Sequence, residues 1–212
     1  MRTIDLQSWP RRHHFEAFKD FHDPRFDMCA NVDLTAFRPV VKEVGSSFTI
    51  AILYVITRAA NSIPAFRQRI RGEAVIEHDV VNPSSTILVD DDLFSFATYE
   101  YDEDYPTFAD GAAAEIAKVR RDPWIRADQG RDDLFYMTAI PWVSFTSFRH
   151  ASLAMPADSV PRMAWGKAFE RDGRTLMPLE IEAHHAVVDG LHVGRFYETV
   201  QGHLDRPGAW LR

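Results

Sequence analysis

The sequence predicts an α+β protein built around one large, mostly antiparallel or mixed β-sheet. Segments with helical apolar spacing lie early in the chain and at its C-terminal end. Runs of β-branched and aromatic residues fill the region between them. No repeat, low-complexity segment or Gly/Ser linker divides the 212 residues, so we expect one domain over residues 1–212.

Apolar residues that recur every three or four positions predict the helices. Three phenylalanines follow this spacing in residues 11–21, and Asp33 is the expected N-cap of the helix after it. Pro64 ends the most apolar of these segments. The predicted helices cover 11–21, 34–44, 48–63, 109–121 and 190–204.

Alternating or β-branched runs bounded by turn residues predict the strands. Arg71-Gly72-Glu73 indicates a hairpin, and Asp172-Gly173 indicates the turn before the last strand. Cys29 lies in a further apparent strand, far from the histidine motif described below. The predicted strands cover 66–70, 74–78, 86–89, 93–101, 134–140, 143–150, 162–169 and 175–185.

The composition, 46% hydrophobic and 26% charged, is typical of a soluble globular protein. A net charge of −7 disfavours nucleic acid and anionic membranes as partners. Residues 48–60 form the most apolar stretch and are too few to span a bilayer. The N-terminus lacks the apolar core of a signal peptide, and the single Cys29 allows no intrachain disulfide, so we expect a cytoplasmic protein with Cys29 as a small core residue.

The segment His184-His185-Ala186-Val187-Val188-Asp189-Gly190 closes a run that alternates like a strand. It places an imidazole at a strand end, a carboxylate in the following turn, and a glycine where the backbone bends. Histidine is suited to general-base work because its unperturbed pKa is near neutrality. This motif is therefore the first candidate for a catalytic site.

A metal site is the competing interpretation, because His184, His185, Asp189 and His192 are all possible ligands. Adjacent histidines on a strand point to opposite faces, so His184 and His185 cannot bind one ion without distorting it. A purely structural, hydrogen-bonded His185 is the other alternative. We favour acyl transfer, in which a base deprotonates a hydroxyl as it attacks a thioester, and we expect no metal.

Four ordered motifs resemble the chloramphenicol acetyltransferase family, which uses acetyl-CoA. Residues 8–18, SWPRRHHFEAF, look like the opening Trp-x-Arg-x-x-His-Phe segment, and 32–37, VDLTAF, follow at the expected distance. Residues 141–148, PWVSFTSF, are a further match. Residues 177–179 lead into the histidine motif, which 189–196, DGLHVGRF, completes.

The resemblance implies a two-layer α/β sandwich that assembles as a homotrimer, with each active site between two subunits. It implies that His185 is the general base and that Asp189 forms a buried, structural ion pair with Arg11. Lys167 would face the phosphates of acetyl-CoA. Thr138 stands where the family has a serine that stabilises the oxyanion, and it keeps the hydroxyl donor.

The pocket for the acceptor departs from the family pattern. Phe18, Phe94 and Phe148 keep aromatic positions, but His150 replaces a leucine. Three further departures are Ala164 for a threonine that holds a water, Pro24 for a cysteine, and the segment 125–128, which lacks an expected aromatic. A more polar pocket favours a different hydroxyl or amine acceptor over an aryl antibiotic.

The resemblance thus implies acetyl transfer from acetyl-CoA to a small-molecule hydroxyl, with chloramphenicol as the leading acceptor. An acyltransferase of the same family with another acceptor is one alternative. A non-catalytic trimeric binding protein with a decayed site is another. A lipoamide acyltransferase core is disfavoured, because we find no lipoyl or partner-binding segment before the domain.

Overall fold

The computed structural model describes residues 1–90, 92–123, 130–151 and 158–211. Its main feature is a seven-stranded sheet with the order β2-β10-β8-β7-β5-β6 and a short β9 paired with β10. The strands are β2 Arg25–Asp33, β5 Asn82–Leu88, β6 Phe94–Thr98, β7 Leu134–Ile140, β8 Arg162–Gly166, β9 Phe169–Arg171 and β10 Arg174–His184.

The sheet is mixed, as predicted, because β7 runs parallel to both β5 and β8 while the other pairs are antiparallel. A smaller three-stranded sheet forms at the N-terminal side. Its strands are β1 Arg2–Thr3, β3 Gln68–Arg71 and β4 Ala74–Glu77.

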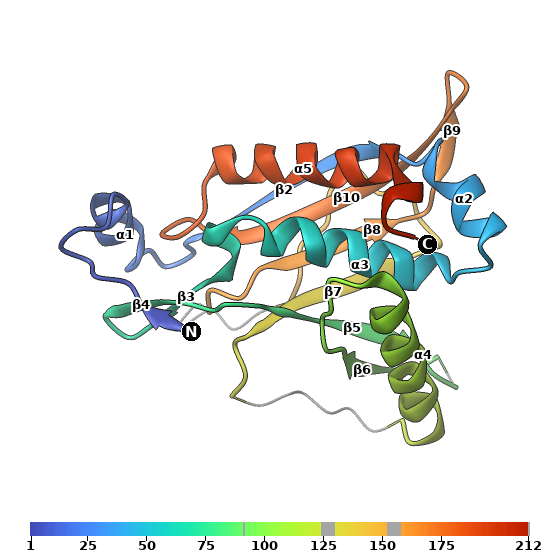
Figure 1. The fold of residues 1–212 in the computed structure, drawn as a ribbon. Helices are drawn as coiled ribbons and strands as arrows, with labels where there is room; N and C mark the ends of the chain where they lie inside the picture. Colours follow the sequence, from blue (N-terminus) through green and yellow to red (C-terminus); the bar gives the residue numbers. More distant parts are fainter. Residues whose placement is uncertain (91, 124–129, 152–157, 212) are drawn as a thin grey trace.

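Helices cover one face of the large sheet, where α3 and α5 lie side by side along the strands (Figure 1). Almost every residue of α3 from Ile50 to Ala60 is buried, which explains its nearly uniform apolar sequence. The α+β fold with one large mixed sheet is confirmed. The helices are α1 Arg12–Phe18, α2 Phe37–Glu43, α3 Phe48–Asn61, α4 Tyr105–Arg121 and α5 Gly190–Asp205, with short 3-10 helices at Pro64–Arg67 and Pro207–Ala209.

Strand β10 is buried on both faces, and its two faces differ in chemistry. Leu179, Ile181 and Ala183 join the apolar core beneath the helices. Glu180, Glu182 and His184 alternate with them and point to the opposite face, yet they are no more than 3% exposed. The sheet therefore carries a buried polar face on the side away from α3 and α5.

The strand predicted over residues 143–150 is wrong. This segment forms turns and irregular backbone, with Trp142 and Val143 largely exposed. Both edges of β7 are already occupied, by β5 and by β8, so the segment after β7 cannot fold back as a hairpin partner of β7. It instead crosses the polar face of the sheet, where the Val143 carbonyl accepts a hydrogen bond from the Lys167 amide.

The Asp33 N-cap is also wrong. Asp33 ends β2, and its carboxylate accepts bonds from the Thr35 amide and hydroxyl, while α2 starts at Phe37 after a turn. Asp104 instead caps α4, which begins four residues before the predicted start at 109. The predicted 162–169 strand divides into β8 and β9, and 66–70 begins as a 3-10 helix.

Strand β2 pairs with β10 along almost its whole length. Cys29, although distant from the histidine motif in sequence, is therefore adjacent to β10 in the sheet. It lies directly opposite Glu180. Cys29 is half-buried rather than a core residue, and burial raises the pKa of its thiol. Among the described residues, no helix has both the length and the apolar character needed to cross a bilayer.

Candidate active site

The histidine motif lies where β10 ends and α5 begins. Asp189 is the N-cap of α5, and its carboxylate accepts hydrogen bonds from the Leu191 and His192 amides. The His192 ring returns the bond by accepting from the Asp189 amide at 3.1 Å, which completes a capping box. The aspartate of the motif thus fixes the start of a helix.

Arg11 joins this cap from the distant N-terminal segment. Its guanidinium is ion-paired and hydrogen-bonded to the Asp189 carboxylate, and it also donates to the His185 carbonyl at 3.3 Å. Burial by itself would raise the pKa of Asp189, but the Arg11 bond and the nearby His192 and Arg11 charges outweigh it and lower that pKa. The pair predicted between Arg11 and Asp189 is therefore present.

The His185 side chain is held between two aromatic rings. Phe18 of α1 stacks on the imidazole with ring centroids 4.1 Å apart and planes 3° from parallel. Phe26 of β2 lies at 4.9 Å in a tilted arrangement. The His185 amide donates to the Pro24 carbonyl at 2.8 Å, so both backbone and ring have a fixed orientation.

His184, the other histidine of the pair, has a structural position. Its Nδ1 accepts a hydrogen bond from the Ala186 amide, and its carbonyl accepts from the Val187 and Val188 amides, which closes the turn after β10. Burial lowers its pKa to about 4, with a smaller contribution from Arg25. No group of three or more described His, Cys, Asp or Glu residues is arranged to hold a metal ion.

A second set of predicted site residues lies on the polar face of the sheet. Thr138 of β7, Ala164 of β8 and Glu180 of β10 are direct neighbours across three adjacent strands. Thr138 is half-buried. Because neighbouring strands lie about 4.8 Å apart, the backbones of Thr138 and Glu180 are about 10 Å apart.

Thr138 and His185 of the same chain do not meet. Glu180 is level with Thr138, and His184 is four residues further along β10, about 13 Å at the usual rise per residue. The Cα atoms of Thr138 and His185 are therefore on the order of 16 Å apart. No pair of side chains spans that distance to reach one reacting carbonyl.

The aromatic residues predicted for the acceptor divide between these two places. Phe18 belongs to the His185 end. Phe148 contacts His150 edge to face at 4.9 Å, over the polar face of the sheet. Phe94 lies on β6, at the edge of the sheet opposite β2, and packs on Phe96. Residues 125–128 lie outside the described residues.

Sequence reasoning missed the charged residues of the polar face, which are the Glu180 and Glu182 carboxyls. The pattern Leu-Glu-Ile-Glu resembles a strand with a solvated face, and only burial by the segment after β7 reveals otherwise. Glu182 lies 3.5 Å from Arg162 and 3.9 Å from Arg25. His150 Nδ1 lies 3.7 Å from Glu180.

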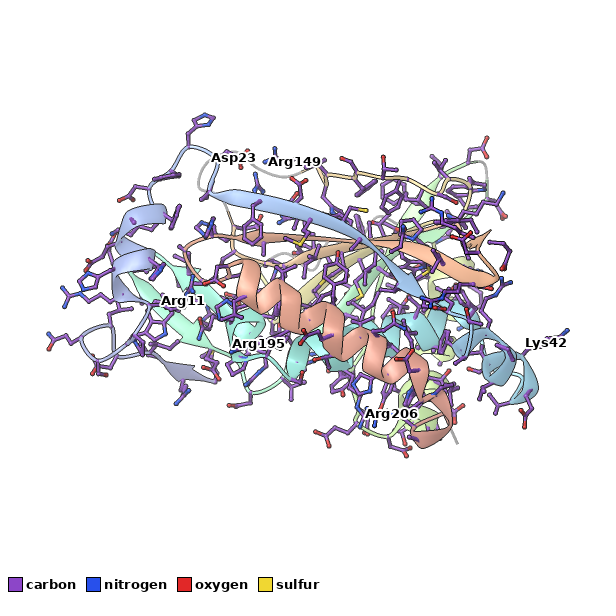
Figure 2. All side chains as sticks on the ribbon, turned by 90° about the horizontal axis from the view of Figure 1, so that it is seen from above. Arg11, Asp23, Lys42, Arg149, Arg195 and Arg206 are labelled. Carbon is purple, nitrogen blue, oxygen red and sulfur yellow. The ribbon has the colours of Figure 1, made fainter. Side chains whose placement is uncertain are left out.

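Lys167 directly follows β8 and is exposed. Its neighbour Ala168 lines a cavity of about 660 Å³, together with Arg38 and Lys42 of α2. Lys42 projects from the end of the molecule opposite Arg11 (Figure 2). A basic cavity therefore lies beside Lys167, far from His185 of the same chain.

The family model for chloramphenicol acetyltransferase matches residues 1–201. The chain belongs to the chloramphenicol acetyltransferase family. It is 32% identical over 204 residues to a Klebsiella chloramphenicol acetyltransferase, covering 96% of this chain and 93% of the relative. A Haemophilus influenzae chloramphenicol acetyltransferase 2 is 30% identical over 201 residues, covering 93% and 94%. The family predicted from the sequence motifs is thus confirmed.

Solved structures agree with this assignment. A chloramphenicol acetyltransferase structure has a TM-score of 0.90 at 30% identity and covers 96% of this chain and 99% of its own. A probable dihydrolipoamide acetyltransferase from Listeria monocytogenes has a TM-score of 0.67 at 19% identity, covering 97% and 95%, which shows a shared fold alone. The enzyme class expected from the sequence, an acyltransferase of the chloramphenicol acetyltransferase type, is therefore confirmed.

Proposed function

We propose that this protein transfers an acetyl group from acetyl-CoA to the hydroxyl of a small molecule, with chloramphenicol as an acceptor. The observation that carries the proposal is the fixed position of His185. The Phe18 ring, the Pro24 carbonyl and the Arg11–Asp189 pair orient it at the end of β10. The relatives named above are chloramphenicol acetyltransferases, which supports that acceptor.

In the proposed mechanism His185 removes the acceptor proton as the hydroxyl oxygen attacks the thioester carbonyl. A tetrahedral intermediate forms, and the Thr138 hydroxyl donates a hydrogen bond to its oxyanion. Collapse breaks the carbon–sulfur bond, and the departing thiolate takes the proton from the His185 imidazolium. The products are the acetyl ester and CoA, and the enzyme returns to its starting state.

The separation of His185 from Thr138 supports an active site made between two copies of the chain. Neither residue reaches the other within one chain, as the strand geometry shows. A second copy that places its His185 opposite this chain's Thr138 would bring them together. We therefore propose a homo-oligomer, a trimer by resemblance to the family, with each site shared by two neighbours.

Acetyl-CoA would bind with its phosphates near Lys167. The 660 Å³ cavity beside Ala168, with Arg38 and Lys42 on its wall, provides cationic groups for them. In this proposal the CoA end of the site lies just after the strand that carries Ala164, and Ala164 is the neighbour of Thr138. An enzyme that consumes acetyl-CoA and has a single cysteine is suited to the cytoplasm.

A non-catalytic binding protein remains the alternative from another class. The intact Arg11–Asp189 pair and the stacked His185 argue against a decayed site, because together they keep an imidazole in a fixed orientation at the end of β10. The alternative predicts no acetyl transfer to any acceptor.

The first test measures thiol release from acetyl-CoA with chloramphenicol and with a panel of other alcohols. We expect release with chloramphenicol. No release with any acceptor would overturn the proposed function, and release with other alcohols alone would reassign the acceptor.

The shared site is tested by mixing two variants. His185→Ala and Thr138→Val should each lose most activity, because each site then lacks its base or its oxyanion donor. Co-refolding the two at equal amounts should restore about a quarter of the sites of a cyclic oligomer, those in which both missing groups are present. No recovery above the single variants, despite proven mixing by mass spectrometry, would contradict a site between copies.

A further inference from the structure

Two neighbouring side chains on the polar face lack every hydrogen bond that they could make with the described residues. Both carboxyl oxygens of Glu180 and both ring nitrogens of His150 are buried and have no partner there. Glu180 is 0% exposed, and His150 Nδ1 lies 3.7 Å from its carboxyl. Buried polar groups are almost always hydrogen-bonded in native proteins, so these four atoms are available to a partner beyond the described residues, as are both carboxyl oxygens of Glu182.

The charges around Glu180 indicate the sign of that ligand. The described side chains of this cluster include five acids and three arginines: Asp23, Asp27, Asp158, Glu180 and Glu182, against Arg25, Arg149 and Arg162. Each arginine already has another acid as a partner. The cluster thus has an excess of carboxyls, which a cation would complement.

The protonation states of the two side chains agree with this. Burial, then Glu182 and Asp27, raises the pKa of the Glu180 carboxyl to about 9, and a nearby Ala164 amide opposes the shift to a smaller extent. Burial and then Arg162 lower the pKa of His150 to about 4, so its ring is neutral and has one acceptor nitrogen. The Arg162 charge acts on both groups, but it does not offset the burial of Glu180 or its repulsion from Glu182 and Asp27.

The position of Glu180 relative to Thr138 relates this cluster to the reaction. The two residues share one face, about 10 Å apart across the strands, and Ala164 lies between them. Alanine adds only a methyl group to the surface between the carboxyl and the threonine. A small molecule with its hydroxyl near Thr138 could therefore place a second polar group at Glu180.

We propose that Glu180 and His150 bind the protonated amine of an amino-alcohol acceptor, a second substrate class beside neutral chloramphenicol. This rests on the proposed acetyl transfer. The ammonium would donate to the Glu180 carboxylate and to the free His150 nitrogen, while the hydroxyl at its other end is acetylated. Charge-assisted hydrogen bonds of this kind would pair the Glu180 carboxylate and the acceptor nitrogen of His150, to an extent set by the number of N–H groups on the ammonium.

His150 is the group that an acceptor would displace or contact first. It belongs to the irregular segment after β7 and not to a strand, and it packs edge to face on Phe148. A change of its side-chain rotamer leaves the sheet unaltered. Glu180, in contrast, is fixed on the central part of β10, between β2 and β8.

The experiment compares two alcohols that differ only in charge. One is a five-carbon chain with a hydroxyl at one end and a protonated dimethylamino group at the other. The second has a neutral isopropyl group in place of the dimethylamino group. A tertiary amine forms no stable amide, so thiol release reports transfer to the hydroxyl alone.

The wild-type enzyme should favour the charged alcohol over the neutral one by about tenfold or more in kcat/KM. Glu180→Gln should reduce that ratio to near one. Glu198→Gln removes an exposed carboxyl from α5 and is the matched control, with an unchanged ratio. Thermal unfolding and mass photometry report the fold and assembly of each variant.

The wild-type ratio tests the proposal even if the variant fails to fold. Equal use of the two alcohols by the wild type, with chloramphenicol still acetylated, would overturn this inference and leave the proposed function intact. No thiol release with any alcohol would overturn both. If the oligomer of the Glu180→Gln variant dissociates while the variant still favours the charged alcohol, a cationic side chain of a second copy occupies the cluster. That outcome would also overturn the inference.

Discussion

The end of β10 and its middle are built in opposite ways. At the end, the Asp189 carboxylate accepts bonds from Arg11 and from two backbone amides, and a planar ring contact holds His185. In the middle, Glu180 lies against His150 with no hydrogen bond to either side chain from the described residues. The first arrangement fixes its side chains by contacts within the protein, although Arg11 Nε and His185 Nδ1 have no partner among the described residues. The second leaves all four polar atoms of Glu180 and His150 without such a partner.

The difference corresponds to two proposed roles on one strand: His185 takes part in the reaction, and Glu180 recognises the acceptor. A general base must be preorganised before substrate arrives, so its supports are internal to the protein. A group that recognises an acceptor must keep its bonding capacity free until binding, which costs stability in the unliganded protein. The same strand can do both because the two sites are about 13 Å apart along it.

The largest expected effect is on the rate, when His185 at the end of β10 is replaced. His185→Ala should lower kcat/KM by about 10³-fold, within the usual range for loss of a general base, and leave the melting temperature nearly unchanged. His13→Ala is the control, because the His13 side chain is 91% exposed. A near-normal rate in the His185 variant would show that another group removes the proton.

Breaking the Arg11–Asp189 pair should affect stability and rate together. Asp189→Ala strands the Arg11 charge and removes the N-cap of α5, so we expect a loss of about 3 kcal/mol in the free energy of unfolding. Asp189→Asn keeps a capping oxygen and should lose less. Urea denaturation of both variants checks this, and equal losses would mean that the loss comes from the charge pair and that the capping oxygen contributes nothing.

The segment over the polar face depends on Gly166. A Cβ at this position would lie 2.7 Å from both Pro178 Cγ and the Val143 carbonyl oxygen, so Gly166→Ala should displace the segment that carries His150. We expect a loss of about 1–3 kcal/mol and a raised KM for the acceptor. Gly194→Ala, on α5 with open space around its Cβ, should instead be neutral or slightly stabilising.

A separate effect, on stability alone, is a pH-dependent change at Glu180. Its folded pKa is about 9 and exceeds the unfolded value, so the folded state holds the proton more tightly. Raising the pH from about 4.5 to about 9 therefore destabilises the wild type through this group. The charged and titratable groups that face it are His150, Glu182, Asp27 and Arg162.

Glu180→Gln removes that titration. The variant should gain melting temperature relative to wild type as the pH rises from 5 to 9, at about 2–4 °C per kcal/mol. Differential scanning fluorimetry across this range measures the gap. A gap that stays constant with pH would mean that Glu180 is already ionised in the unliganded protein.

Much of the fold follows from local sequence. The helical spacing in residues 48–63 and 190–204 corresponds to α3 and α5, and the alternation in 175–185 corresponds to β10. Residues 143–150 do not fold back as a strand beside β7, because the two edges of β7 are occupied by strands distant in sequence. A local run of residues does not determine which other strands are available to pair with it.

The sequence by itself determined the candidate base from the histidine motif, because spacing of a few residues places it at a strand end, before a turn and a helix cap. Four ordered motifs together determined the family, and the resemblance implied the role of the aspartate. Tertiary structure decided what lies around it. Only the sheet shows that Thr138 and His185 of one chain are too far apart to act together. Only burial by the segment after β7 turns Glu180 from a solvated carboxyl into an unpaired one, because desolvation depends on contacts between residues far apart in the chain.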